Sequence, residues 1–500
     1  MPFPLLSRRL RSYRFSDALN GIARNLSATV VARGVSMTVT VLFTALFSRH
    51  VGVGGFGQYA YALSLTTLLG GLCGFGLDNW AIRELVHAPN DSARIIGQAL
   101  FLQVLLSILC LGGLAAYFTF VHRDPAVLSV TLIVGAYTFL DVSGLLVISV
   151  FRAREVMAYE AIAVSIGNAA LLLLTLAGIA LHLGIRGVLA LVSTSYLLKF
   201  IITVWYAKRR CGVGSLTREM RPAATPLRAG FPFFVSSIGS TVYANYPRLI
   251  LAVFVALPMV GLYAAAERVI ALVLVASGIL DIVVYPMFAR RIEHSSEAFT
   301  RVYQQVVDFT LVVGLLIGVG VAAVLPEIVR ILFGSAYRDA VPVGMLLVPG
   351  IAMSALGYVS ARAMFVLHRE KLMSVTVAAT TAAGIAIAFF LVRSYGVKGM
   401  AVTTLLTSAF GYLFYFIYLR IKLGLPWITA KYVTFFALFV TAFGVSYAAQ
   451  AGGLLQRLLV NGAMLLLMVV LFWMTGMLDW LRVFQVRVVS DDATVSVASS

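Results

Sequence analysis

The sequence predicts an all-α polytopic membrane protein with 14 transmembrane helices. Fourteen apolar stretches follow one another between residues 28 and 478, and only short connections separate them. A hydrocarbon core about 30 Å thick is crossed by about 20 apolar residues in a helix, and a helix satisfies its own backbone hydrogen bonds inside lipid. Composition agrees, because 61% of the residues are hydrophobic and 12% are charged, against about 45–50% and about 25% in soluble domains.

The connections are too short to hold a folded domain outside the membrane. Continuous apolar runs such as Leu171–Leu176 also argue against a transmembrane barrel, whose strands alternate apolar and polar residues. The predicted helices occupy 28–48, 58–80, 95–119, 127–151, 160–183, 187–206, 229–255, 259–288, 306–325, 341–367, 373–393, 397–421, 430–448 and 455–478.

Short sequence echoes divide the chain into two halves. In the same order and at similar spacing, Leu183–Val188 matches Tyr395–Met400, Gly57–Ala60 matches Gly261–Ala264, and Arg154–Glu155 matches Arg369–Glu370. Internal repeats of this kind are typical of alternating-access transporters. The predicted organisation is a basic cytoplasmic N-terminus (1–27), a six-helix bundle (28–206), a basic cytoplasmic linker (207–228), a second six-helix bundle (229–421), two additional helices (430–478) and a cytoplasmic tail (479–500).

The net charge of +18 is distributed unevenly along the chain. With the N-terminus in the cytoplasm, most Lys and Arg residues fall in cytoplasmic segments, which is the positive-inside pattern and predicts that both termini are cytoplasmic. The largest cluster comprises Lys208, Arg209, Arg210, Arg218, Arg221 and Arg228. Topology and attraction to anionic lipid explain this charge, so we expect no nucleic-acid partner.

No cofactor or metal is expected. The three cysteines, Cys73, Cys110 and Cys211, fit no metal-binding or disulfide spacing. The chain contains no phosphate-cradling glycine-rich loop with a following Lys-Ser or Lys-Thr, which argues against ATP as the energy source.

Several motifs resemble one transporter family over nearly the whole chain. They are Arg49–Tyr61, which contains Gly-Val-Gly-Gly-Phe-Gly-Gln-Tyr, then Gly74-Phe75-Gly76-Leu77, Arg83-Glu84, Arg248–Leu251 and Val260–Ala266. The sequence resembles the O-antigen and exopolysaccharide repeat-unit flippases of the multidrug/oligosaccharidyl-lipid/polysaccharide exporter superfamily. One position departs from the family pattern, because Pro247 stands where many members place an acidic residue before the arginine.

The resemblance implies two helix bundles that form a V around a central cavity. It implies translocation of undecaprenyl-pyrophosphate-linked oligosaccharides across the bacterial inner membrane, in which no bond is made or broken, so no enzyme activity is expected. A polysaccharide polymerase and a chain-length regulator are the implied protein partners. Coupling to an ion gradient is expected because no ATP site is present.

Charged residues at membrane depth are rare and are candidates for function. The basic candidates are Arg33, Lys199, Arg248, Arg268 and Arg362, and the acidic residues are Asp78, Asp141, Glu267, Asp281 and Asp308. Guanidinium groups match phosphate oxygens in bidentate geometry, so the basic set predicts contacts with a substrate pyrophosphate. The alternatives are snorkelling to the headgroups for Arg33, Lys199 and Arg362, and an ion pair with Glu267 for Arg248 or Arg268.

The acidic residues divide into two groups. Glu267, Asp141 and Asp281 are candidates for ion coupling, because a buried carboxyl can carry a transported proton. Their alternatives are a salt bridge for Glu267, a hydrogen bond for Asp141 and a charge at a helix end for Asp281. Asp78 and Asp308 lie near predicted helix ends, where a structural role is expected.

Two tyrosines flank a suspected irregularity in the seventh predicted helix. The run Asn245-Tyr246-Pro247 is expected to break this helix locally and to expose backbone carbonyls. Tyr243 and Tyr246 are therefore candidates for stacking on sugar rings, with ordinary helix packing as the alternative.

Rival functions remain open at this point. A peptidoglycan-precursor flippase of the same superfamily would need a similar site for an anionic lipid. A cation-coupled multidrug exporter is less consistent with so many arginines at depth. A membrane-embedded polymerase or ligase is disfavoured by the short outer loops, and a structural scaffold by the charges at membrane depth.

Overall fold

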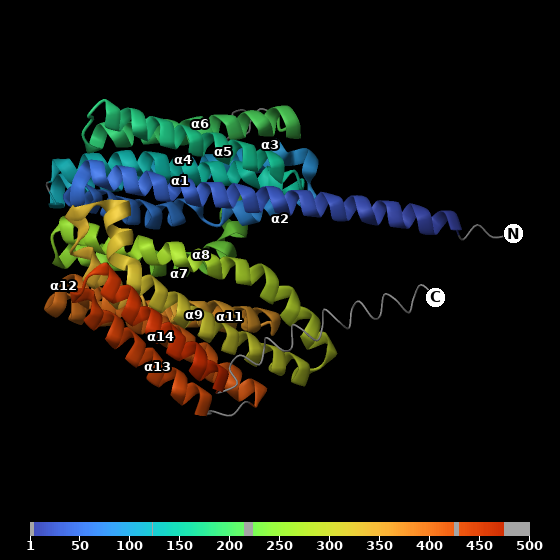
Figure 1. Ribbon diagram of the computed structural model, residues 1–500. Coiled ribbons are helices and arrows are strands. Elements are labelled where there is room, and N and C mark those ends of the chain that lie inside the picture. Colours follow the sequence, from blue (N-terminus) through green and yellow to red (C-terminus); the bar gives the residue numbers. More distant parts are fainter. Residues whose placement is uncertain (1–4, 123, 215–223, 425–429, 475–500) are drawn as a thin grey trace. The chain divides into compact units, whose positions relative to one another are not determined.

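The computed structural model describes residues 5–122, 124–214, 224–424 and 430–474, and within them all regular secondary structure is helical. This confirms the predicted all-α class. The longer helices are α1 (Leu5–Gly74), α2 (Leu77–His87), α3 (Ser92–Tyr117), α4 (Pro125–Ala153), α5 (Met157–Ala180), α6 (Ile185–Cys211), α7 (Ala224–Phe254), α8 (Leu257–His294), α9 (Ser296–Phe333), α10 (Ala340–Leu347), α11 (Gly350–Val366), α12 (Glu370–Leu423), α13 (Ala430–Ala448) and α14 (Leu454–Met474) (Figure 1).

The chain divides into two compact units, and the boundary along the sequence falls within α7. Unit 1 ends at Asn245 and unit 2 begins at Tyr246. The sequence-based division into six-helix bundles placed the boundary earlier, in the linker 207–228, and that division stays a prediction.

Two long helices each combine a pair of predicted ones. In α1 the only non-helical residue is Gly52 (φ 70°, ψ −179°), and in α12 it is Gly396 (φ 56°, ψ −131°). A positive φ is readily adopted by glycine because it has no Cβ, so a single residue can turn the chain. The predicted loops between 48 and 58 and between 393 and 397 are therefore single-residue kinks.

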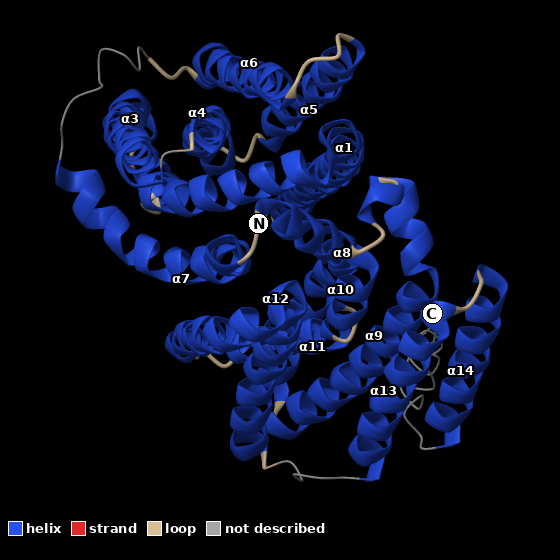
Figure 2. Ribbon diagram, turned by 90° about the vertical axis from the view of Figure 1, so that its left-hand side faces the viewer, coloured by secondary structure: helices blue, strands red, loops and turns tan. Residues whose placement is uncertain are grey.

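Helix α4 lies at the centre of unit 1, with α3, α5 and α6 around it (Figure 2). It packs against α1, α2, α3 and α6, and most of its residues from Val127 to Phe151 are buried. Pro125 begins the helix, and the Asp124 side chain accepts hydrogen bonds from the backbone N–H groups of Ala126 and Val127. The central position brings the polar side chain of Asp141 into contact with neighbouring helices.

In unit 2 the two C-terminal helices are joined to α9 by specific polar contacts. Pro326 lies inside α9 and has no N–H, so the carbonyl of Ala322 lacks its usual helical donor. The Gln450 side chain, from the turn between α13 and α14, donates a hydrogen bond to that carbonyl at 2.9 Å. Arg457 of α14 forms an ion pair with Glu327 of α9. These contacts attach α13 and α14 to unit 2.

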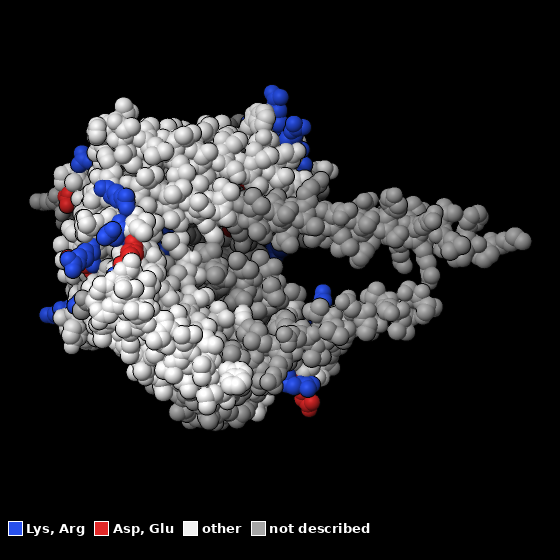
Figure 3. Space-filling view, viewed as in Figure 1, with Lys and Arg blue, Asp and Glu red and all other residues white. Residues whose placement is uncertain are grey.

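Length, composition and surface character all fit a membrane environment. Ten segments of the described residues are long and apolar enough to cross a membrane, and two of them, Gly34–His87 and Glu370–Leu423, contain two predicted helices each. Large apolar side chains such as Val253 (77% exposed) and Phe390 (73% exposed) lie on the outside. On the face seen in Figure 3, charged side chains gather towards the helix ends. The count of fourteen spans stays a prediction.

The predicted break in the seventh helix is wrong. Helix α7 continues through Asn245-Tyr246-Pro247 to Phe254. The amide of Asn245 donates to the carbonyl of Thr241 at 2.9 Å, and Tyr246 is buried. A proline removes one helical hydrogen bond but does not oblige the chain to unwind when tertiary packing holds the helix on both sides.

Candidate functional site

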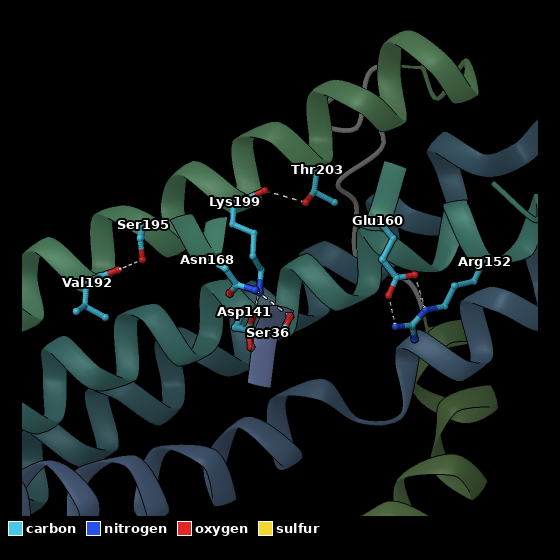
Figure 4. A network of polar contacts seen from close by, with 9 residues as sticks. All are labelled: Ser36, Asp141, Arg152, Glu160, Asn168, Val192, Ser195, Lys199 and Thr203. Atoms are coloured by element: carbon cyan, nitrogen blue, oxygen red, sulfur yellow. Dashed lines mark hydrogen bonds and ion pairs between the residues drawn. The ribbon is translucent and has the colours of Figure 1, made fainter. Parts of the chain in front are cut away.

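Unit 1 contains an ion pair between Lys199 of α6 and Asp141 of α4, two helices that are long and apolar enough to cross a membrane. The side chains are 17% and 36% exposed, respectively. Next to them the amide of Asn168, on α5, donates to the hydroxyl of Ser36, on α1, at 2.8 Å. Figure 4 shows these four side chains gathered between four helices. The sequence named Lys199 and Asp141 separately, and the structure brings them together.

Close helix contact positions the lysine. A Cβ added at Gly167 of α5 would lie 2.8 Å from the Cβ of Lys199, so glycine is what lets the lysine stem lie against α5. The Lys199 Nζ lies 5.2 Å from the centre of the Tyr196 ring. A cation over an aromatic face is attracted by the ring quadrupole. The lysine is therefore held by a carboxylate and an aromatic ring.

Three tyrosines extend this cluster. The Tyr196 ring stacks on Tyr137 with centroids 4.7 Å apart, and the hydroxyl of Tyr137 donates to that of Tyr59 at 3.4 Å. Tyr137 and Tyr59 are buried. These residues do not stand out in the sequence, because aromatic residues are abundant in membrane helices and carry no individual signal. The spacing of Tyr137 and Asp141, four residues apart on one helix face, was the available clue.

Unit 2 contains the second ion pair. Arg248 Nε of α7 lies 3.0 Å from Glu267 Oε2 of α8, and their side chains are 19% and 29% exposed. One turn before Glu267, the fully buried Tyr263 shares a hydrogen bond of 2.9 Å with Thr404 of α12. The ion pair that the sequence offered as an alternative for Arg248 is therefore present.

Arg268 differs from its neighbours. It follows Glu267 on α8 and is half-buried, and within the described part of the chain it has no ion-pair partner. Side chains one position apart on a helix point about 100° apart at 3.6 residues per turn. Arg268 therefore projects to a different side of α8 from Glu267. Counted by themselves, these two arginines and one carboxylate carry one net positive charge.

For the remaining candidate residues, the structure gives only their exposure or their position in a helix. Arg362 is half-buried on α11, and Asp308 is half-buried on α9. Asp78 lies in the first turn of α2, where a negative charge is favourable. The side chains of Arg33 and Asp281 lie outside the described residues.

The two candidate stacking tyrosines are found in different environments. Tyr246 is 5% exposed and packs against α12, where a Cβ added at Gly384 would lie 2.5 Å from its hydroxyl oxygen. Tyr243 is half-buried. This packing corresponds to the alternative role, a helix contact, for Tyr246, and the stacking role of Tyr243 stays a prediction.

Some buried charges were not selected from the sequence. Arg457 is 6% exposed and pairs with Glu327, and Arg420 is 3% exposed with its guanidinium 4.7 Å from the Phe416 ring centre. Both arginines lie near predicted helix ends, where the sequence favours a headgroup role. Their burial depends on which neighbouring helix covers them, and that information is tertiary.

Comparison with known structures identifies the fold. The lipid II flippase MurJ in its inward closed conformation matches with a TM-score of 0.69 and 14% identity, covering 89% of this chain and 98% of that one. An inward-facing multidrug resistance MATE family transporter of the MOP superfamily matches at 0.61 and 13%, covering 79% and 98%. A MOP superfamily transporter from Pyrococcus furiosus matches at 0.57 and 14%, covering 80% and 95%. No curated protein matches the chain in sequence.

The chain shares the fold of these proteins, and its long apolar helices are those of a multi-pass membrane protein. Residues 22–292 match the model of the polysaccharide biosynthesis protein family, which is more than half of the chain. The chain belongs to the polysaccharide biosynthesis protein family.

Proposed function

We propose that this protein flips undecaprenyl-pyrophosphate-linked oligosaccharide repeat units from the cytoplasmic to the periplasmic leaflet of a bacterial inner membrane. Transport would proceed by alternating access, serve O-antigen, capsule or exopolysaccharide synthesis, and leave both termini in the cytoplasm. A polymerase and a chain-length regulator would take up the product. The observation that carries the proposal is the net positive charge of Arg248, Glu267 and Arg268 in a membrane protein of a polysaccharide biosynthesis family.

Pyrophosphate chemistry fits this charge arrangement. A pyrophosphate in transit through the membrane loses much of its hydration and needs cationic hydrogen-bond donors in place of water. Arg268 has its guanidinium available for the first contact, because no described carboxylate pairs with it. Arg248 would then exchange Glu267 for a phosphate oxygen. Two guanidinium groups could bind the two phosphates while Glu267 holds Arg248 in place when the site is empty.

The ion pair of unit 1 is the better candidate for coupling to a gradient. Lys199 and Asp141 balance each other's charge, so the pair offers no net charge to an anionic substrate. Protonation of Asp141 would leave the ammonium of Lys199 with Tyr196 as its remaining described partner and would favour a rearrangement of α4 against α6. Glu267 is the second candidate, through its pair with Arg248.

Transfer of a fluorescent undecaprenyl-pyrophosphate oligosaccharide across proteoliposomes tests the proposal. We expect Arg268→Ala to lower the transfer rate about tenfold, equivalent to about 1.4 kcal/mol, because a charge-assisted hydrogen bond to the pyrophosphate is lost. Arg268→Lys should retain part of the rate, because the charge remains while bidentate geometry is lost. The matched control is Arg393→Ala, since Arg393 is exposed on α12.

The outcomes separate the rival functions. Transfer that is equal in Arg268→Ala and Arg393→Ala would move the phosphate site elsewhere and reject the role of Arg268. Transfer of lipid II alone would identify a peptidoglycan-precursor flippase. Transfer of a cationic drug, with none of either lipid under imposed proton or sodium gradients, would identify a drug exporter.

A further inference from the structure

Two cysteines that are distant in sequence meet between helices of unit 1. The Sγ atoms of Cys73, near the end of α1, and Cys110, on α3, are 3.4 Å apart. Both helices are long and apolar enough to cross a membrane. The third cysteine, Cys211, is at the end of α6. Sequence spacing gave no reason to pair any of the three, because this contact is created by the packing of α1 against α3.

We propose that Cys73 and Cys110 are a redox modification site, a dithiol that lipid hydroperoxides convert into a disulfide within the membrane. A disulfide needs an Sγ–Sγ distance of about 2.05 Å. The sulfurs are already in van der Waals contact, so a shift of about 1.4 Å shared by two side chains with rotatable χ1 angles would form the bond. Neither the family nor the proposed transport reaction requires this chemistry.

Exposure determines which sulfur reacts first. Cys73 is fully buried, whereas Cys110 is partly exposed and follows Ile108 and Leu109, each 61% exposed on the outside of α3. Large exposed apolar side chains in a membrane-spanning helix face acyl chains. A hydroperoxide carried on an acyl chain therefore reaches Cys110 from the bilayer, while Cys73 is shielded.

The reaction balances without a further reductant or oxidant. The thiol sulfur of Cys110 attacks the terminal peroxide oxygen, the O–O bond breaks, and the lipid leaves as an alcohol after taking up the thiol proton. Cys110 is then a sulfenic acid. The sulfur of Cys73 attacks the Cys110 sulfur, the S–O bond breaks, and hydroxide leaves as water with the Cys73 proton. Two thiols and one hydroperoxide give one disulfide, one alcohol and one water.

A polar stripe on α3 supports these proton transfers. Gln103, Ser107 and Cys110 follow the spacing i, i+4 and i+7, which places them on one helix face. Ser107 lies close to Cys73. Gln103 is 1% exposed, and its Oε1 has no hydrogen-bond partner within the part of the chain that the structure describes. Burying such an acceptor without a partner is unfavourable, but it lies about 10 Å along the helix from Cys110, so Ser107 is the nearer polar group of the stripe.

The disulfide would lie next to the left-handed turn that joins α1 to α2. Cys73 precedes Gly74-Phe75-Gly76, in which Phe75 (φ 47°) and Gly76 (φ 65°) are left-handed. The Phe75 ring stacks on Phe234 of α7 with centroids 4.7 Å apart. Linking Cys73 to α3 would fix the turn between α1 and α2 and restrain its contact with α7.

The test uses the full-length protein in liposomes exposed to cumene hydroperoxide. Free thiols are then alkylated under denaturing conditions, and the peptides are analysed by mass spectrometry before and after reduction with dithiothreitol. We expect a Cys73–Cys110 linked peptide in most chains, lost on reduction, and formed equally well by the control Cys211→Ser. In Cys73→Ser the reaction should stop at Cys110 sulfenic acid, which dimedone traps.

Three results would overturn the proposal. They are a linked peptide that contains Cys211, oxidation of Cys110 to sulfonic acid in wild type without a disulfide, or no change in either thiol under conditions that oxidise a lipid-exposed model thiol. None of these readouts depends on transport, so the proposal stands or falls separately from the proposed function.

Discussion

The ion pairs Lys199–Asp141 and Arg248–Glu267 look alike as residue types and differ in their surroundings. Lys199–Asp141 in unit 1 lies among side chains from four helices, with Tyr196 against the ammonium and Asn168 and Ser36 beside it (Figure 4). Arg248–Glu267 in unit 2 joins two consecutive helices and has Arg268 next to it. The first pair is electrically balanced, and the second group has one positive charge in excess.

This difference separates two tasks. An anionic headgroup is attracted by excess positive charge. Of the two groups, only the one in unit 2 supplies such an excess. A balanced pair in a low-dielectric site instead responds strongly when one partner gains or loses a proton, because the remaining charge is left uncompensated. We therefore expect the unit 1 pair to control conformation and the unit 2 group to contact substrate.

The largest expected effect follows from breaking the unit 1 pair. Asp141→Asn leaves the ammonium of Lys199 without its counter-charge and should lower the free energy of unfolding by about 3 kcal/mol, at the lower end of losses for buried pairs because Asp141 is partly exposed. Thermal unfolding in detergent measures this change.

The double variant Asp141→Asn/Lys199→Met is the control for that prediction. It removes both charges, so most of the lost stability should return. A double variant as unstable as Asp141→Asn would show that the aspartate acts through contacts other than the ion pair.

The next comparison is between two glycines, Gly167 beside Lys199 in unit 1 and Gly384 beside Tyr246 in unit 2. A Cβ at Gly167 would meet the Lys199 Cβ at 2.8 Å, whereas a Cβ at Gly384 would meet the end of the Tyr246 side chain at 2.5 Å and a Thr407 methyl at 2.8 Å. The Cβ of Lys199 is fixed by the backbone, while a tyrosine ring and a methyl can shift. We expect Gly167→Ala to cost about 2 kcal/mol and Gly384→Ala about 1 kcal/mol, within the range for overpacking.

Urea or thermal unfolding of the two alanine variants checks this order. Gly144→Ala is the matched control, because its added Cβ would only touch Phe200 at 4.0 Å. A larger loss for Gly384→Ala than for Gly167→Ala would mean that Tyr246 is held more rigidly than its burial suggests.

Much of this arrangement was predictable from the sequence, for identifiable reasons. Long apolar runs predict the helices because the bilayer fixes their length, and Lys199, Asp141, Arg248 and Glu267 stand out because charges are costly there. Partner choice was less accessible. Whether Glu267 binds Arg248 or Arg268 depends on which helix face meets α7, and residues 267 and 268 differ by only one position.

Other features could not be predicted for the same reason, because they depend on how the helices pack against one another. The run Asn245-Tyr246-Pro247 predicts a break from local rules, but Asn245 bonds within the helix and Tyr246 packs against α12. The contact between Cys73 and Cys110 joins two helices whose alignment along each other cannot be read from the sequence. The match of Arg154-Glu155 to Arg369-Glu370 is also displaced, because the corresponding left-handed turn residues are Glu155 (φ 56°) and His368 (φ 54°).

A smaller effect is expected from neutralising the acidic member of the unit 2 group. Glu267→Gln keeps an acceptor for Arg248, and a delocalised guanidinium is less strongly hydrated than an ammonium. The loss of stability should be about 1 kcal/mol, clearly below that of Asp141→Asn. Binding of a pyrophosphate lipid should tighten, because Arg248 no longer has to leave a carboxylate.

Thermal unfolding and lipid binding by Glu267→Gln are measured on the same preparation. Glu267→Asp is the matched control, since it keeps the charge on a shorter side chain. Weaker lipid binding by Glu267→Gln than by wild type would indicate that the carboxylate positions Arg248 for the substrate rather than competing with it.

The smallest effect is expected from removing the hydrogen bond between Tyr263 and Thr404, one helical turn before Glu267. Tyr263→Phe removes a 2.9 Å bond to Thr404, but the threonine hydroxyl also donates to the carbonyl of Met400 at 3.1 Å. No donor is left without an acceptor, so the stability should fall by only about 0.5 kcal/mol, at the low end for a lost hydrogen bond. The ring stays buried, which preserves the packing of α8 against α12.

Thermal unfolding of Tyr263→Phe beside Thr404→Val tests this account, because the valine leaves the buried tyrosine hydroxyl without its described partner and should cost more. Equal losses would show that the packing of the two side chains, and not the satisfaction of their hydroxyls, fixes the helix that carries Glu267 and Arg268.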